Sequence, residues 1–258
     1  MRRRYTLIGV FDSGVGGLSV LRGIRARLPS ADLVYVADRA RSPYGTRSLD
    51  EVETISAGVA DWLIDRGVTC LVVACNTASA AALDTLRALH PDLPIVGMEP
   101  AVKPAVLASN TGTVAVFATA ATFQGRLFAS VVDRFAAGVE VLTRACPEWV
   151  EFVERGQVGG PEVEASIAQA VDPVVAEGAD VVVLACTHFS FLGPAISQIS
   201  GLEVVDPASA VAAQVARVAP DADGTGELTL AASGDATEFG ALASALASMT
   251  GPVIPFPS

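Results

Sequence analysis

Two cysteines stand where an apolar run meets small polar residues, and a thiol in such a place can act as an acid or a base. Cys75 follows the run at 71–74, and Cys186 follows the similar run at 181–185. Each run predicts a buried strand that ends in a polar loop. A thiol whose pKa lies near the working pH can both take and return a proton. The two cysteines are therefore candidate acid–base groups.

Two equivalent thiols suit the inversion of a carbon centre. Inversion requires a base that removes a proton from one face and an acid that returns a proton to the opposite face, and identical groups can exchange these roles. Helices are expected directly after Cys75 and Cys186, and the N-terminus of each helix would stabilise a nearby thiolate. The alternative interpretation is that both cysteines are inert residues at the ends of buried strands.

The remaining cysteines, Cys70 and Cys146, are interpreted as structural residues. Cys70 lies inside an apolar run, and Cys146 precedes a proline at an expected helix start. The cysteines contain no C-x-x-C spacing and match no zinc-binding pattern. The sequence therefore predicts free thiols and no metal site.

The segments around the reactive cysteines alternate between expected strands and expected helices. Short apolar runs rich in Val and Ile indicate buried strands, and longer amphipathic stretches indicate helices. Such alternation predicts parallel β-α-β units, whose site-forming loops lie at the carboxyl ends of the strands. The strands are expected at 7–11, 33–37, 71–75 and 94–96, and the helices at about 18–28, 49–66 and 77–89.

The second half of the chain repeats the order of the first. Landmarks that recur in the same order at nearly the same spacing indicate a duplicated domain. The matching landmarks are 8–13 and 114–119, Cys75 and Cys186, and 99–101 and 206–208. We therefore predict an α/β fold of two pseudo-symmetric domains, each a mainly parallel sheet flanked by helices, with the active site in the interdomain cleft.

The chain beyond residue 208 has no counterpart in the first half, and we expect it to pack back on the first domain. Its expected elements are a helix, a polar turn at 220–224, a strand at 227–232 and a last helix at 237–249. The predicted domains are 1–98 plus 208–258, and 99–207.

The composition excludes several classes of function. A formal net charge of −11 and a single lysine, Lys103, argue against a nucleic-acid groove, because phosphate binding needs clustered cations. No apolar run approaches the roughly 20 residues that cross a bilayer. The basic start at 1–5 leads into the turn at Asp12 before an apolar signal core could form. We expect a cytoplasmic protein that binds neither nucleic acid nor membranes.

A series of short motifs runs through the chain from about residue 8 to residue 206. The motifs are Asp12-Ser13-Gly14-Val15-Gly16-Gly17, Pro43-Tyr44-Gly45, Cys75-Asn76-Thr77-Ala78, Gly97-Met98-Glu99-Pro100, Cys146-Pro147 with Phe152-Val153-Glu154, and Cys186-Thr187-His188. In order and spacing this series resembles the glutamate racemase family, with a weaker echo at 233–235. Each motif alone is moderately specific, whereas the ordered set is far more so.

The resemblance implies a cofactor-independent racemase that interconverts L-glutamate and D-glutamate by a two-thiol mechanism and supplies D-glutamate for peptidoglycan. By this analogy Cys75 deprotonates the D-enantiomer and Cys186 the L-enantiomer. Asp12 would assist the first thiol, and His188 and Glu154 the second. The implied partners are glutamate and, in a homodimer, a second copy of the chain. The implied substrate contacts are Asp12, Ser13, Tyr44, Gly45, Asn76, Thr77, Thr119, Thr122, Thr187 and His188.

The residue types at these positions suit such a substrate without reference to the family. Glutamate carries two carboxylates and an ammonium group, so its site needs hydroxyl, amide and backbone donors together with a carboxylate such as Asp12. Its Cα proton is a very weak acid without an electron sink. Pyridoxal phosphate would supply a sink, but Lys103 lies between Pro100 and Pro104 with no loop that resembles a phosphate site. A dry cleft with donors directed at the carbanion is therefore expected.

The supporting residues also have simpler interpretations. Asp12 and Ser13 could only cap the following helix, within a tight glycine turn. His188 could be a packed structural residue. Glu154, at a helix end, would ordinarily face water.

Departures from the family pattern occur at Ala118, Ala185 and Ser190, where the family commonly has Gly, Gly and Pro. A methyl group beside Cys186 could tighten the pocket or move the strand end.

Two other functions stay open. A related two-thiol racemase would act on aspartate or a hydantoin, and the D-amino acid formed would identify it. A non-enzymatic protein that binds a small anion or a protein partner would cause no exchange at Cα.

Overall fold

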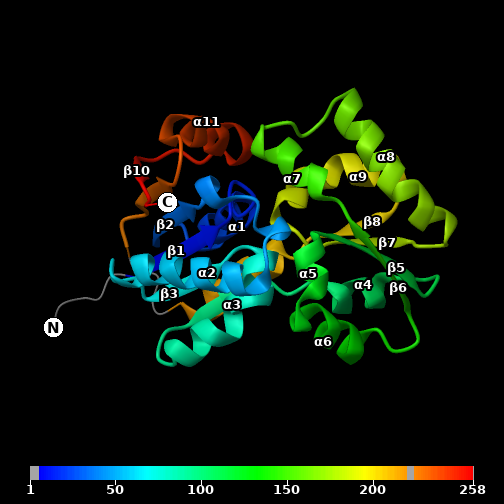
Figure 1. Ribbon diagram of the computed structural model, residues 1–258, viewed down its shortest axis with the longest axis horizontal. Coiled ribbons are helices and arrows are strands. Elements are labelled where there is room, and N and C mark those ends of the chain that lie inside the picture. The colour runs from blue at the N-terminus through cyan, green and yellow to red at the C-terminus, as the bar shows by residue number, and fades with distance from the viewer. Residues whose placement is uncertain (1–5, 220–223, 258) are drawn as a thin grey trace.

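The computed structural model describes residues 6–219 and 224–257, which form two sheets side by side with helices around them (Figure 1). One sheet has the strand order β10-β9-β2-β1-β3-β4 and the other β6-β5-β7-β8, and every pairing is parallel. The strands of the first sheet are β1 (Leu7–Asp12), β2 (Asp32–Ala37), β3 (Cys70–Val73), β4 (Ile95–Gly97), β9 (Leu228–Ala232) and β10 (Val253–Pro255). Those of the second are β5 (Thr113–Ala118), β6 (Glu140–Ala145), β7 (Val181–Leu184) and β8 (Glu203–Val205).

The helices connect successive parallel strands, as the alternating pattern predicts. Around the first sheet lie α1 (Leu18–Arg27), α2 (Leu49–Ile64), α3 (Asn76–Leu89), α10 (Ala208–Val218) and α11 (Ala236–Ala247). Around the second lie α4 (Val102–Ala108), α5 (Ala120–Gln124), α6 (Arg126–Phe135), α7 (Pro147–Glu154), α8 (Pro161–Ala176) and α9 (Gly193–Ser200). Short 3-10 turns are η1 (Arg39–Arg41), η2 (Tyr44–Thr46) and η3 (Thr187–Phe191). No helix in the described part of the chain is long and apolar enough to span a membrane.

The two sheets repeat one topology, which confirms the predicted fold class. The order β2-β1-β3-β4 recurs as β6-β5-β7-β8. Cys75 follows β3 and Cys186 follows β7, which occupy the same place in the two orders. The strands are buried on both faces, so their Val-rich runs read as continuous apolar segments. The repeat therefore brings the two thiols to equivalent strand ends.

The tail of the chain returns to the first sheet. Strand β9 pairs with β2, strand β10 extends the same edge, and α10 packs against α1. Most of the predicted polar turn at 220–224 lies outside the described residues. The short strand β10 had no counterpart among the predicted elements.

An aromatic cluster holds in place the elements of the second half of the chain that lie against the first half. The ring of Trp149 in α7 lies 5.2 Å from Phe117 of β5 and 4.9 Å from Phe189 of η3, measured between ring centroids. All three side chains are fully buried. Burial of each large ring contributes about 1.5–3 kcal/mol relative to an exposed side chain. The cluster thereby holds η3 and α7, which carry His188 and Glu154, in a fixed relation to the sheet.

Candidate active site

The carboxyl ends of strands from both sheets surround one small cavity of about 10 Å³, roughly the space that a single water molecule needs. Most of the predicted site residues line it. From the first half come Ser13, Tyr44, Gly45, Cys75, Asn76 and Thr77, and from the second Thr119, Cys186, Thr187 and His188. The predicted residues Asp12, Thr122 and Glu154 contact this lining from behind. Pro43 and Val150 also line the cavity and were not predicted.

The helix expected after Cys75 is present, and because it begins at Asn76, Cys75 occupies the N-cap of α3. Its Sγ accepts a hydrogen bond from the backbone N–H of Ala78 at 3.4 Å, and the residue is 5% exposed. Burial raises the pKa of the Cys75 thiol, and the negative charge of Asp12 raises it further, against the smaller opposing effect of the Ala78 N–H. In this closed arrangement Cys75 is therefore held as the neutral thiol.

The surroundings of Cys186 differ from this, because the helix that follows it directly is a short 3-10 helix and not an α-helix. The following residues form the 3-10 turn η3, and α9 begins only at Gly193. Pro194 favours the first turn of a helix, so it fixes that later start. In place of a helix N-terminus, Cys186 Sγ has His188 Nδ1 at 3.8 Å.

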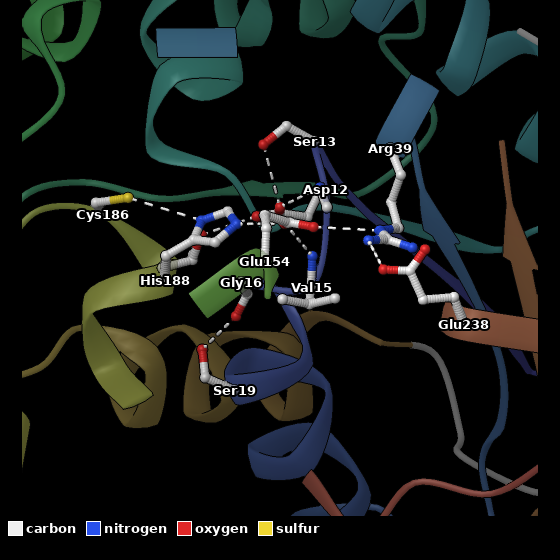
Figure 2. A network of polar contacts seen from close by, with 12 residues as sticks. Asp12, Ser13, Val15, Gly16, Ser19, Arg39, Glu154, Cys186, His188 and Glu238 are labelled. Carbon is white, nitrogen blue, oxygen red and sulfur yellow. Dashed lines mark hydrogen bonds and ion pairs between the residues drawn. The ribbon is translucent and has the colours of Figure 1, made fainter. Parts of the chain in front are cut away.

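His188 is held as a cation despite complete enclosure. Burial alone would lower the pKa of His188, but hydrogen bonds and charge interactions with Cys186 and Glu154 raise it well above its ordinary value. Its Nε2 lies 2.7 Å from Glu154 Oε1 (Figure 2). The ring is therefore placed to exchange a proton with the Cys186 sulfur through Nδ1. The two thiols are thus equivalent by fold but opposite in electrostatic environment.

A charged residue at a helix end would ordinarily face water, but Glu154 does not. Its side chain is 16% exposed, and Oε1 accepts hydrogen bonds from His188 and from the backbone N–H of Val15 at 2.8 Å. Burial favours the neutral acid, but these hydrogen bonds, the charge of His188 and that of Arg39 together lower the pKa of Glu154. Glu154 is therefore a carboxylate that orients His188.

Asp12 lies between the two halves. It is fully buried at the end of β1 and accepts hydrogen bonds from the Gly14 N–H at 2.7 Å, the Ser13 hydroxyl at 3.3 Å and the Thr187 hydroxyl at 2.8 Å. Burial raises the pKa of Asp12, while the positive charge of His188 opposes the rise. Asp12 thus shapes the turn after β1 and also joins it to the loop of Cys186.

Hydroxyl and amide groups fill the side of the cavity near Cys75. The hydroxyls of Thr77, Thr119 and Thr122 lie within 3.0–3.3 Å of one another across the two halves. Asn76 is 3% exposed, and both polar atoms of its side chain lack a hydrogen-bond partner among the described residues. A buried amide without partners is costly unless a ligand satisfies it. Asn76 is accordingly placed to bind a polar ligand.

Tyr44 is held by Asp38 and Ser233, neither of which was among the predicted site residues. Its hydroxyl donates to Asp38 Oδ2 at 2.6 Å, and the hydroxyl of Ser233 donates to Asp38 Oδ1 at 2.9 Å. Burial, and then the charge of Asp38, raise the pKa of Tyr44. Asp38 and Ser233 directly follow the carboxyl ends of β2 and β9, and Asp12 is the last residue of β1. Their place directly after a strand was the sequence signal by which both residues could have been identified.

The cavity is closed by Pro43 and Val150. These two residues line it and also line two larger grooves next to it, of about 460 and 420 Å³. They therefore stand between the cavity and solvent, one from each half of the molecule. A ligand larger than water needs these residues to move apart.

The departures from the family pattern lie away from the cavity surface. Ala118 and Ala185 are fully buried and belong to the apolar cluster on the second sheet, and neither lines the cavity. Ser190 is partly buried in η3. The extra methyl groups are thus accommodated in the core.

Comparison with known proteins agrees with this geometry. Residues 9–215 match the Asp/Glu/Hydantoin racemase family. A glutamate racemase from Pseudomonas aeruginosa is 47% identical over 213 residues, covering 82% of this chain and 80% of the relative. The crystal structure of glutamate racemase from Francisella tularensis with D-glutamate has a TM-score of 0.85 at 26% identity, covering 98% of this chain and 97% of that chain.

A second solved relative carries the other enantiomer. It is the Escherichia coli glutamate racemase in complex with L-glutamate and the activator UDP-MurNAc-ala, with a TM-score of 0.87 at 29% identity and 97% of each chain covered. The family match spans most of the chain, and the solved relatives share its whole architecture. This chain therefore belongs to the Asp/Glu/hydantoin racemase family and is an isomerase.

Proposed function

We propose that this protein interconverts L-glutamate and D-glutamate, with Cys75 and Cys186 as the two acid–base groups. The observation that carries the proposal is the placement of both thiols on one cavity, each at the end of the equivalent strand of a repeated sheet. Groups brought in by two facing repeats approach a bound carbon from opposite sides. Inversion at that carbon requires this arrangement.

The environments of the thiols suggest how a turnover begins. Cys186, beside the His188 cation, takes the Cα proton of L-glutamate as a thiolate, and the neutral thiol of Cys75 returns a proton to the opposite face. The product is D-glutamate with Cys75 as thiolate and Cys186 as thiol. The reverse reaction uses the same groups with their roles exchanged.

The polar lining supports an amino-acid substrate with a second carboxylate. The unpartnered amide of Asn76 and the hydroxyl of Thr77 can donate to carboxylate oxygens, whereas the hydroxyl of Thr187, which donates to Asp12, can accept from the ammonium group. Donors fixed in a nearly closed cavity also stabilise the negative charge that develops at Cα, because water is excluded. Glutamate is the proposed substrate because related structures contain D-glutamate and L-glutamate.

The residues do not fit a pyridoxal phosphate mechanism. Such a mechanism needs a lysine at the reacting centre, and the single lysine, Lys103, lines a different groove with its Nζ 5.4 Å from the centroid of the Phe135 ring. We therefore propose a reaction without a cofactor, in which the thiols transfer the protons and the fixed donors stabilise the charge that develops at Cα. In the cell the proposed role is to supply D-glutamate for peptidoglycan in the cytoplasm.

Racemisation of the purified, reduced protein without added cofactor tests this function. We expect the optical rotation of L-glutamate and of D-glutamate to fall to zero at the same final composition, with little change for L-aspartate. The variant with both Cys75→Ala and Cys186→Ala serves as the inactive control. Loss of rotation with aspartate alone would assign the other substrate of the family, and no change with either would refute the racemase proposal.

A further inference from the structure

Arg39 joins the two halves of the molecule on the His188 side of the cavity. It lies in η1 directly after β2, where its Nε donates to Glu154 Oε2 at 3.2 Å and its Nη2 donates to Glu238 Oε1 at 3.1 Å (Figure 2). The side chain of Arg39 is only 14% exposed. Arg39 thus extends the line of contacts that runs from Cys186 through His188 to Glu154.

Glu154 occupies a place that is unfavourable for a negative charge. Its carboxylate is largely buried, it is the last residue of α7, where the helix dipole is negative, and it is close enough to Asp12 for the two charges to interact. Each of these conditions favours the neutral acid. A neutral Glu154 could form only by taking a proton, and the nearest proton is that of His188.

The hydrogen bond between His188 and Glu154 allows two positions for that proton. It can lie on Nε2, which gives an imidazolium and a carboxylate, or on Oε1, which gives two neutral groups. A cation bonded to the Glu154 carboxylate raises the energy of a proton on Glu154 more than the energy of a proton on the His188 ring, because the ring is farther from the cation. Arginine suits this purpose because it stays charged in proteins.

We propose that Arg39 is a positioning residue for racemisation, which keeps Glu154 ionised and aligned so that a proton received from Cys186 stays on His188. In this step the S–H bond of Cys186 breaks, its proton joins Nδ1, and the existing Nε2–H continues to donate to Glu154. The result is a thiolate beside an imidazolium. The inference rests on the proposed function, because it concerns the thiol that acts on L-glutamate.

Glu238 orients Arg39 without competing strongly for its charge. Its side chain is 57% exposed, so water screens this ion pair, whereas the pair with Glu154 is mostly buried. The titratable and charged groups that surround the His188–Glu154 pair come from several elements. They are Asp12 of β1, Tyr35 of β2, Arg39 of η1, Cys75 before α3, Cys186 after β7 and, through Arg39, Glu238 of α11.

Nitrogen-15 NMR of labelled histidine tests the proposal directly, because the chain has two histidines. The ring-nitrogen shifts distinguish an imidazolium from a neutral ring. We expect His188 to be an imidazolium at neutral pH in the wild type and in Arg39→Lys, and to shift toward the neutral ring in Arg39→Met. His90, a partly exposed residue near Asp61, should not change and reports that the variant is folded.

Kinetics provide the second measurement. Arg39→Met should lower kcat/KM by about tenfold, a fraction of what a general acid–base group contributes, and Arg39→Lys should recover most of it. The loss should be equal in both directions, since the enantiomers have equal free energy. Arg217→Met, which removes an exposed arginine that bonds Gln214 on α10, should change neither measurement.

The two measurements separate the possible failures. If His188 stays an imidazolium in Arg39→Met, the proposal is wrong even when the rate falls, because the loss then arises elsewhere. If Arg39→Met does not fold, Arg39→Gln supplies the neutral side chain for the same comparison. If the wild type leaves glutamate unchanged, the proposed function fails, while the NMR titration still decides what Arg39 does to His188.

Discussion

Replacing either Cys75 or Cys186 with alanine is expected to lower the rate of glutamate racemisation by roughly a thousandfold, the loss typical of removing a general acid or base. Each variant keeps one thiol on one side of the cavity. That thiol can still take a proton, but no group on the opposite face returns one. Racemisation should therefore slow by this factor in both directions in both variants, and chiral chromatography of the products measures the loss.

Cys70→Ala is the matched control for these variants. Cys70 is a fully buried thiol in β3, the strand that leads to Cys75, but it does not line the cavity. We expect its removal to lower the thermal stability slightly and to leave the rate nearly unchanged. Full activity in Cys75→Ala or in Cys186→Ala would eliminate the two-thiol assignment.

The second large effect is expected from Gly16→Ala in the turn after β1. A Cβ atom at this position would lie 2.5 Å from His188 Nδ1 and 2.6 Å from Thr187 Oγ1. Both atoms belong to η3, which the Trp149 cluster holds in place. The methyl group would therefore push the two halves apart or displace His188. An overpacking cost of up to about 3 kcal/mol predicts a loss of up to roughly a hundredfold in kcat/KM.

Gly14→Ala should act in the same way, because its Cβ would overlap the carboxylate of Glu154. Gly58→Ala is the control. It adds a methyl group at an exposed position of α2 with no heavy atom within 4 Å, so we expect unchanged activity and a gain of up to about 1 kcal/mol in stability from the helix propensity of alanine. Wild-type activity in Gly16→Ala would show that close approach at this turn is not needed. Steady-state kinetics and thermal unfolding of the three variants provide the measurements.

Much of the fold could be predicted from the sequence, because its signals are local. Val-rich runs such as 71–74 and 181–185 form buried parallel strands, and their repetition indicates two related sheets. The same local reasoning did not show that the helix at Thr187-His188-Phe189, directly after Cys186, would be a short 3-10 helix. Pro194, seven positions further along, sets the helix at Gly193 and leaves a 3-10 turn before it. That turn gives Cys186 a histidine in place of a helix N-terminus.

The candidate site could be predicted only where a residue lies next to its motif. Cys75, Asn76 and Thr77 follow one strand and line the cavity directly. The burial of Glu154 depends instead on His188 and Arg39, which are distant in the sequence and meet it only after both sheets have formed. A charged residue at a helix end carries no local sign of such partners. For the same reason Asp38 was not predicted, because its carboxylate accepts hydrogen bonds from Tyr44 and from Ser233 of the tail.

The central claim is that two thiols act on one carbon from opposite faces, and isotope incorporation in heavy water tests it most directly. Starting from L-glutamate and sampled early, the D-glutamate formed should carry deuterium at Cα, because its proton comes from the solvent-exchanged thiol of Cys75. The remaining L-glutamate should keep its protium, and the mirror result should hold when the reaction starts from D-glutamate. Deuterium appearing in the unreacted enantiomer as fast as in the product would contradict the account, because it would mean that a single base removes and returns the proton.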